Sequence, residues 1–122
     1  MLGYVTLGIN DFERSKAFYD AALAGLGGKF AMKTGRGQLY GNGNGPLLGI
    51  TAPFDGKPAG HGNGTMVALA APSRAVVDTV YADALKAGAA DEGAPGIRTG
   101  TFYGAYFRDP DGNKICVFTT GS

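Results

Sequence analysis

The sequence has few of the features that usually indicate a catalytic site or a membrane location. Its 122 residues include one cysteine, Cys116, and one histidine, His61. A single cysteine cannot form an internal disulfide, so a cytoplasmic location is expected. No run of about 18 apolar residues occurs, which excludes a membrane-spanning helix. The opening MLGYVTLGIND lacks a basic segment and is expected to form a strand, not a signal peptide.

Charge also excludes two classes of partner. The formal net charge is +1, which gives no electrostatic reason to expect nucleic acid or an anionic membrane surface. What the sequence does have is the composition of a folded domain, with 44% hydrophobic and 17% charged residues. The length suits one domain with a real core. The glycines gather at 41–45 and 60–64, which indicates loops.

In the first half, the apolar residues first alternate as in a strand and then recur at helical spacing. Apolar residues of Met1–Ile9 alternate, and Asn10 or Asp11 can cap the helix that begins near Phe12. Glycines at 25, 27 and 28 end that helix. Three short strands are then expected, at Lys29–Thr34, Gln38–Gly41 and Leu47–Thr51.

The second half repeats this order after a linker at Pro53–Gly64. A strand is expected at Thr65–Ala71, and Ser73 caps a helix that has Lys86 in its last turn. Tyr4 and Tyr19 are 15 residues apart, as are Met66 and Tyr81. The sequence therefore predicts tandem βαβββ modules: module one at 1–55, a linker at 56–64 and module two at 65–122. We expect an α+β fold whose sheets form a half-open barrel around a shared cavity.

The stretch FYGAYFRDPDGNKICVF, residues 102–118, predicts the hairpin that closes module two. Asp109-Pro110-Asp111-Gly112 carries the residues of a type I turn followed by a left-handed glycine. That register pairs Asp109 with Asn113 and sets Tyr106 opposite Cys116. Alternation then gives an apolar face for the core, and a mixed face that is the better candidate for a ligand site. The mixed face holds Phe102, Gly104, Tyr106, Arg108, Lys114, Cys116 and Phe118.

The whole chain resembles the vicinal oxygen chelate superfamily of glyoxalase I, bleomycin resistance proteins and extradiol dioxygenases. The resemblance rests on YVTLGINDFERSKAFY, on GHGNGTMVALAAPSRAVVDTVYADALKAGA and on YGAYFRDPDGNKICVF. It implies homodimers, and a site on the inward faces of the strands. In the family's enzymes, histidine and carboxylate ligands hold a divalent metal there. In this chain those positions hold Tyr4, Met66 and Cys116, and a further carboxylate position falls near Gly49.

This departure bears on the chemistry because octahedral divalent metals bind imidazole and carboxylate ligands. Phenol, thioether and thiol groups do not supply that set, so we expect no metal and no cofactor. His61 is either a general base or substitute ligand, or an exposed loop residue among glycines. Cys116 is either a reactive thiol near Lys114 or a small buried apolar residue. Arg98 and Arg36 are expected in loops, either solvated or clamping an anion.

The preferred interpretation is a metal-independent binding protein for a drug or metabolite. Tyr106 and Tyr4 are expected either to bond a ligand or to bond a neighbouring strand, and Met66 offers adaptable surface. The alternative is a lyase, isomerase or dioxygenase with ligands recruited from His61, Cys116 or loop carboxylates such as Asp91 and Glu92. A scaffold with a filled cavity is the third possibility. The predicted ligand-binding residues are Tyr4, Thr6, Gly49, Met66, Phe102, Tyr106, Cys116 and Phe118.

Overall fold

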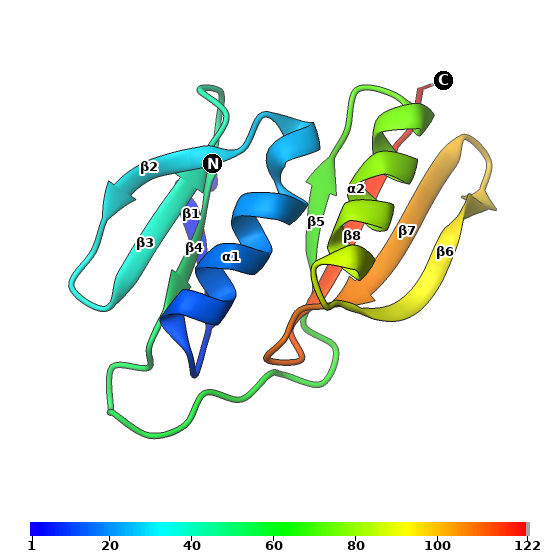
Figure 1. Cartoon of the computed structure of the whole chain (residues 1–122). Helices are drawn as coiled ribbons and strands as arrows, with labels where there is room; N and C mark the ends of the chain where they lie inside the picture. The colour runs from blue at the N-terminus through cyan, green and yellow to red at the C-terminus, as the bar shows by residue number, and fades with distance from the viewer. Residues whose placement is uncertain (122) are drawn as a thin grey trace.

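The computed structural model describes residues 1–121 and shows the predicted α+β fold, a tandem repeat of a strand, a helix and three strands (Figure 1). Ser122, the last residue of the predicted second module, lies outside the described residues. The first repeat consists of β1 (Tyr4–Gly8), α1 (Phe12–Ala22), the 3₁₀ turn η1 (Ala24–Leu26), β2 (Lys29–Lys33), β3 (Gly37–Gly41) and β4 (Leu47–Thr51). The second consists of β5 (Val67–Ala70), α2 (Arg74–Lys86), β6 (Ala90–Thr99), β7 (Phe102–Arg108) and β8 (Lys114–Thr119).

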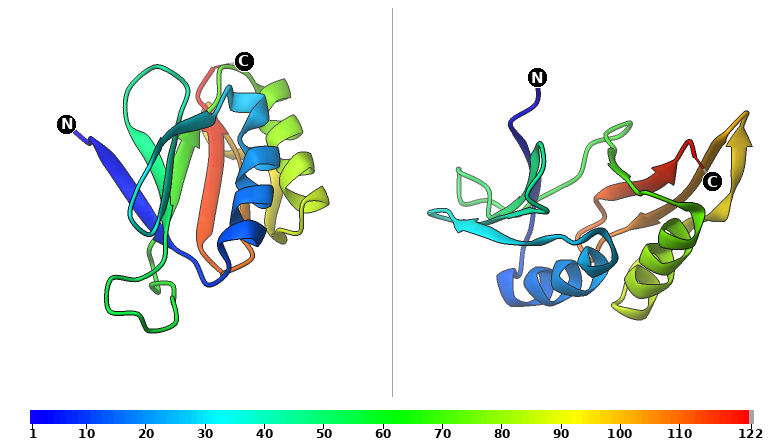
Figure 2. Two further views of the ribbon diagram at one scale, coloured as in Figure 1. Left: turned by 60° about the vertical axis from the view of Figure 1, so that its left-hand side comes forward. Right: turned by 90° about the horizontal axis from the view of Figure 1, so that it is seen from above.

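Each repeat forms its own four-stranded mixed sheet. The strand orders are β1-β4-β3-β2 and β5-β8-β7-β6, and in both sheets the first strand pairs in parallel with the last. Both helices lie on one side of the two sheets (Figure 2). The opposite face of each sheet is therefore left without a helix, and we call these the open faces. The sheets form no closed barrel.

Both helices begin at the residues that the sequence predicts. The Asp11 side chain accepts a hydrogen bond from the backbone N–H of Arg14 at 3.1 Å, and Ser73 accepts one from Val76 at 3.2 Å. Such caps satisfy a backbone donor of the first turn that has no partner within the helix. No helix among residues 1–121 is long and apolar enough to cross a membrane.

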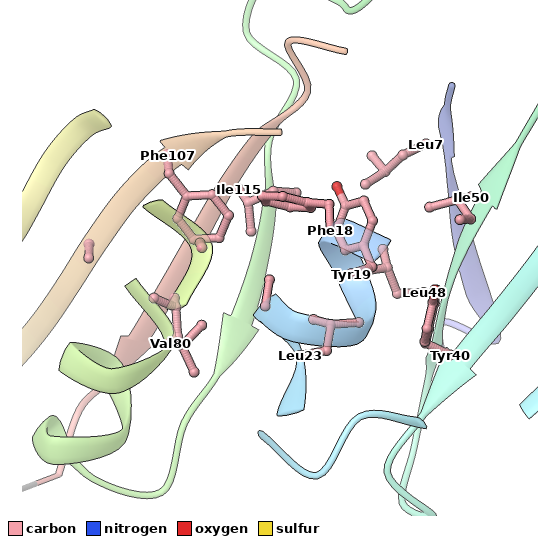
Figure 3. Close-up of a cluster of buried hydrophobic side chains, with 14 of the residues drawn as sticks. Leu7, Phe18, Tyr19, Leu23, Tyr40, Leu48, Ile50, Val80, Phe107 and Ile115 are labelled. Atoms are coloured by element: carbon pink, nitrogen blue, oxygen red, sulfur yellow. The ribbon is translucent and has the colours of Figure 1, made fainter. Parts of the chain in front are cut away.

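One core joins the two repeats, and α1 supplies its centre. Phe18 and Tyr19 are each 1% exposed, and their rings meet edge to face with centroids 4.9 Å apart. Figure 3 shows these rings between the side chains of the two sheets. Phe107 of β7 lies on one flank and Ile50 of β4 on the other. Burial of this continuous apolar surface holds the sheets at a fixed position relative to each other.

The closing hairpin has the predicted register. Asp109 and Asn113 form the last backbone hydrogen bond before the turn, and Gly112 takes the left-handed conformation with φ of 87°. Tyr106 pairs with Cys116. The apolar face, including Phe107 and the neighbouring β8 residues, is buried under α2 as expected.

β6 is the element that the residue pattern did not locate. Pro95 and several glycines suggested a loop, but Ala90–Thr99 forms a strand that pairs with β7 through three register shifts. The prediction that Arg98 lies in a loop was therefore wrong, and so was the description of Asp91 and Glu92 as loop carboxylates. Irregular pairing accommodates the proline and glycines that a regular strand would exclude.

Candidate functional site

The open face of the second sheet carries an aromatic surface. The rings of Phe102 and Phe118 are stacked, with centroids 5.0 Å apart and an interplanar angle of 5°. Small residues beside them make room, because a Cβ atom at Gly104 would come within 2.9 Å of the Phe102 ring. Ala70 pairs with Phe118 on the other side. Both rings are half-buried, so the stack presents a flat apolar surface to solvent.

Tyr106 and Cys116 form the next pair on this face. The Cys116 side chain is fully buried, whereas Tyr106 is partly exposed. Burial raises the pKa of the Cys116 thiol, and burial also raises the pKa of the Tyr106 phenol. Both groups are therefore protonated near neutral pH. This favours Cys116 as a packing residue over a reactive thiol, and leaves Tyr106 with a hydroxyl that can donate to a ligand.

Two cationic groups converge on the Tyr106 ring. The guanidinium carbon of Arg98 lies 5.2 Å from the ring centroid, and the Lys114 Nζ lies 5.6 Å from it. The Arg98 Nη2 also donates to the carbonyl of Ala94 at 2.6 Å. Arg108, on the same strand face as Tyr106, is instead paired with Glu92 at 2.9 Å. The aromatic surface thus borders a positively charged one.

The open face of the first sheet has a different lining. It contains a hollow of about 470 Å³. Of the predicted residues, Tyr4 and Thr6 line it. Gly49 lies beside Thr6 in the sheet, and its missing side chain leaves room for Leu39 and Thr6. Arg36 stacks on Phe54 with its guanidinium carbon 5.1 Å from the ring centroid. The hollow is lined by Tyr4, Thr6, Met32, Thr34, Gly35, Arg36, Leu39, Ile50 and Thr51.

The predicted residues form two groups on separate sheets. Phe102, Tyr106, Cys116 and Phe118 lie together on the second sheet, and none of them lines the hollow on the first. Met66 directly precedes β5 and is 43% exposed. Between the inner edges of the sheets lies a second, largely apolar hollow of about 340 Å³. Its lining runs from Leu2, Val5 and Leu48 to Val67, Ala68, Leu69 and Ala70.

The DPDGN turn does more than reverse the chain, because its carboxylates reach into the first repeat. Asp111 accepts hydrogen bonds from Asn10, from the Arg14 Nη2 at 2.8 Å and from the Ser15 hydroxyl at 3.1 Å. Its side chain is only 1% exposed. Charge-assisted bonds of this kind are strong when they are shielded from water. Asp111 therefore attaches the hairpin to the start of α1.

Asp109 makes the matching contact deeper in the core. It accepts a hydrogen bond at 2.5 Å from the hydroxyl of Tyr19, whose pKa is raised by burial and by the two nearby carboxylates. Asn113 donates to Asp109 at 2.9 Å and to the carbonyl of Gly8 at 3.0 Å. The residue pattern did not reveal these contacts. The sequence feature that could have indicated them is Tyr19 in the apolar stripe of α1, because a buried phenol needs a hydrogen-bond partner.

His61 lies in the linker, is exposed, and lines neither of the two hollows. Its ring rests against Gly112, where an added Cβ atom would approach the ring to 2.5 Å. Glycine is therefore favoured at position 112 for two reasons: it leaves space for the His61 ring, and it adopts the left-handed φ of the turn. The contact favours the interpretation of His61 as a loop residue that packs on the turn.

The donors at the positions where the resemblance predicts metal ligands do not fit a divalent metal site. Tyr4 is 62% exposed and Cys116 is fully buried, while Gly49 has no donor and Met66 offers only a thioether. The alternative donors have other partners, because Asp91 accepts from Tyr81 at 2.8 Å and Glu92 pairs with Arg108. Among residues 1–121, no three His, Cys, Asp or Glu side chains are grouped to hold a metal ion.

Comparison with known proteins agrees with this architecture. The family model described as the Glyoxalase/Bleomycin resistance protein/Dioxygenase superfamily matches residues 1–117. A glyoxalase/bleomycin resistance protein from Albidiferax ferrireducens T118 is 41% identical, with a TM-score of 0.90 and 98% of each chain covered.

More distant structures share the same fold. A glyoxalase-related enzyme from Fulvimarina pelagi is 21% identical, with a TM-score of 0.77 over 98% of this chain and 87% of that one. A lactoylglutathione lyase from Agrobacterium tumefaciens is 20% identical, with a TM-score of 0.67 over 98% and 92%. No protein of curated function matches the sequence. At these identities, the two structures carry information about the fold alone.

Proposed function

The chain belongs to the glyoxalase/bleomycin resistance protein/dioxygenase superfamily, and from this premise we propose that it binds a small organic molecule without a metal ion. The observation that supports this most is the open face of the second sheet. A stacked phenyl pair there adjoins a phenol and two cations, and the buried thiol of Cys116 lies where the resemblance predicts the family's last metal carboxylate.

The chemistry of this face suits binding better than metal catalysis. Ligand sites combine apolar or aromatic walls with a few polar groups that fix orientation. Phe102 and Phe118 supply the wall, and Tyr106 supplies a protonated hydroxyl. The face is open in one chain, so the ligand needs a further wall for close enclosure. We propose that a second copy of the chain supplies it.

A homodimer also accounts for the exposed apolar residues of the first sheet. Leu2 is 66% exposed, Tyr4 62% and Val5 37%, all on or next to β1, an edge strand. Edge strands with exposed apolar residues are usually covered in the native assembly. We propose that this edge is part of the dimer contact. A cytoplasmic location remains a prediction from the single cysteine.

Native mass spectrometry of the protein, isolated from its own cell extract under mild conditions, tests the binding function. We expect an organic adduct that is retained in the folded protein and released on denaturation. The same spectra report whether the chain is a dimer. Lactoylglutathione lyase activity with added nickel or zinc, abolished by Cys116→Ala or His61→Ala, would instead support a metal-dependent enzyme.

A further inference from the structure

We infer that the open face of the second sheet selects an aromatic carboxylate, in which a planar apolar ring and an anionic group are joined by a short spacer. This inference names the ligand class of the proposed binding function and therefore rests on it. Three features of the face carry it: two cations that have no carboxylate partner within residues 1–121, a prepared position for one of them, and an adjacent aromatic surface.

The first feature is uncompensated positive charge. Arg98 and Lys114 both lie over the Tyr106 ring, and within residues 1–121 neither forms a salt bridge. Nearby Arg108 differs, because Glu92 neutralises it. Two cations near one ring favour an anionic ligand, whose charge offsets theirs.

The second feature is the prepared position of the Arg98 guanidinium. Its Nη2 donates to the carbonyl of Ala94 at 2.6 Å, and its guanidinium carbon lies over the Tyr106 ring. Glycines beneath it leave the necessary space, since a Cβ atom would lie 3.1 Å from the Arg98 Nη2 at Gly93 and 3.0 Å from its Nη1 at Gly96. A guanidinium held in this way loses little freedom when it binds a carboxylate through its remaining donors.

The third feature is the spacing between charge and ring surface. Phe118 lies two residues from Cys116 on β8, and Cys116 pairs with Tyr106. Two residues of a strand span roughly 7 Å, so the Phe118 position lies about that far along β8 from the Tyr106–Cys116 pair, and Arg98 lies over the Tyr106 ring. An aromatic carboxylate with a short spacer can therefore contact the phenyl pair and the groups around Tyr106 at the same time. Its ring would extend the Phe102–Phe118 stack, and its carboxylate would reach Arg98, Lys114 and the Tyr106 hydroxyl.

The test is calorimetric titration of the full-length protein with 2-naphthylacetate and with 2-naphthylacetamide, which has nearly the same size and no charge. The acid is expected to bind about 10-fold more tightly than the amide. Arg98→Gln is expected to weaken acid binding about 10-fold and Lys114→Gln several-fold, and neither is expected to change amide binding. Far-UV circular dichroism checks that the variants are folded, which is expected because Arg98 is exposed.

The chain offers matched controls for both substitutions. Arg74 lies over Tyr103 and Lys33 lies over Phe12, each as a cation on an aromatic ring outside this face. Arg74→Gln and Lys33→Gln remove the same charge and are expected to leave acid binding unchanged. Equal weakening by the control and site variants would overturn the inference, because it would show a general charge effect.

The remaining outcomes separate this inference from the proposed function. If the acid and the amide bind equally to the unmodified protein, selection of an anion is refuted and small-molecule binding stands. If neither probe binds, the aromatic carboxylate class is refuted, while the adduct seen by native mass spectrometry decides the binding function independently. Tighter binding of the acid that Arg98→Gln does not reduce would also refute the assigned site.

Discussion

Asp111→Ala is expected to lower the free energy of unfolding by about 3 kcal/mol, although the residue lies in a surface turn. Turn residues away from special contacts usually change stability by less than about 0.5 kcal/mol. The larger expectation follows from the contacts across the repeats. The carboxylate accepts two hydrogen bonds from Asn10, one from Arg14 and one from Ser15.

The magnitude depends on which donors are left without a partner. Ser15 is fully buried, and Asp111→Ala removes the carboxylate that accepts from its hydroxyl. An unsatisfied buried donor costs about 1–3 kcal/mol. The Arg14 side chain is 47% exposed and can be rehydrated, so its lost ion pair adds about 1 kcal/mol or less. The sum is about 1–4 kcal/mol, which includes the expected loss of about 3 kcal/mol and overlaps the lower end of the about 3–5 kcal/mol measured when a buried pair is broken.

Urea unfolding followed by far-UV circular dichroism measures this effect, since the chain has no tryptophan for a fluorescence signal. Asp55→Ala is the matched control, because Asp55 is exposed and, within residues 1–121, accepts one hydrogen bond, from the backbone N–H of Lys57. Asp111→Asn keeps one carbonyl acceptor, so its free energy of unfolding is expected to fall by about half as much as that of Asp111→Ala. Equal losses for Asp111→Ala and Asp55→Ala would refute the role of the turn as an attachment between the repeats.

Three further predictions concern the core and its titrating groups. Phe107→Ala is expected to lower the free energy of unfolding, measured in urea, by about 3–5 kcal/mol, because it removes a buried ring. Phe54→Ala removes an exposed ring and is expected to lower it by less than about 0.5 kcal/mol. Burial raises the pKa of Tyr40 from 10.0 to about 12. Its contribution to stability is therefore complete below about pH 10 and is lost as the pH rises toward 12, and Tyr40→Phe should flatten that decline. Cys116, buried with a raised thiol pKa, is expected to react with iodoacetamide at least about 10-fold more slowly in the folded protein than in urea, and equal rates would contradict its burial.

The parts of the fold that could be predicted from the sequence are those set by local chemistry. The residues of the DPDGN turn determine the hairpin register, so the pairing of Tyr106 with Cys116 follows from the sequence alone. The caps at Asp11 and Ser73 were predictable for the same reason, because the donor lies three residues away.

The parts that could not be predicted depend on distant or irregular pairing. Asp111 and Ser15 are 96 positions apart, and no local pattern indicates their hydrogen bond. Pro95 and the glycines of β6 are typical of a loop, but these residues form a strand whose register shifts three times. The prediction that Arg98 lies in a loop was wrong for this reason. Lys114 was expected on this face, but the position of Arg98 was not, since only the strand brings Arg98 over Tyr106.

Elemental analysis of the purified protein, after equilibration with excess nickel, zinc, manganese and iron(II) and removal of free metal, tests metal-independent binding most directly. The donor chemistry at Tyr4, Gly49, Met66 and Cys116 predicts well under one tightly bound metal per chain, with an unchanged far-UV spectrum in chelator. One stoichiometric metal per chain, lost in Cys116→Ser, would contradict the account.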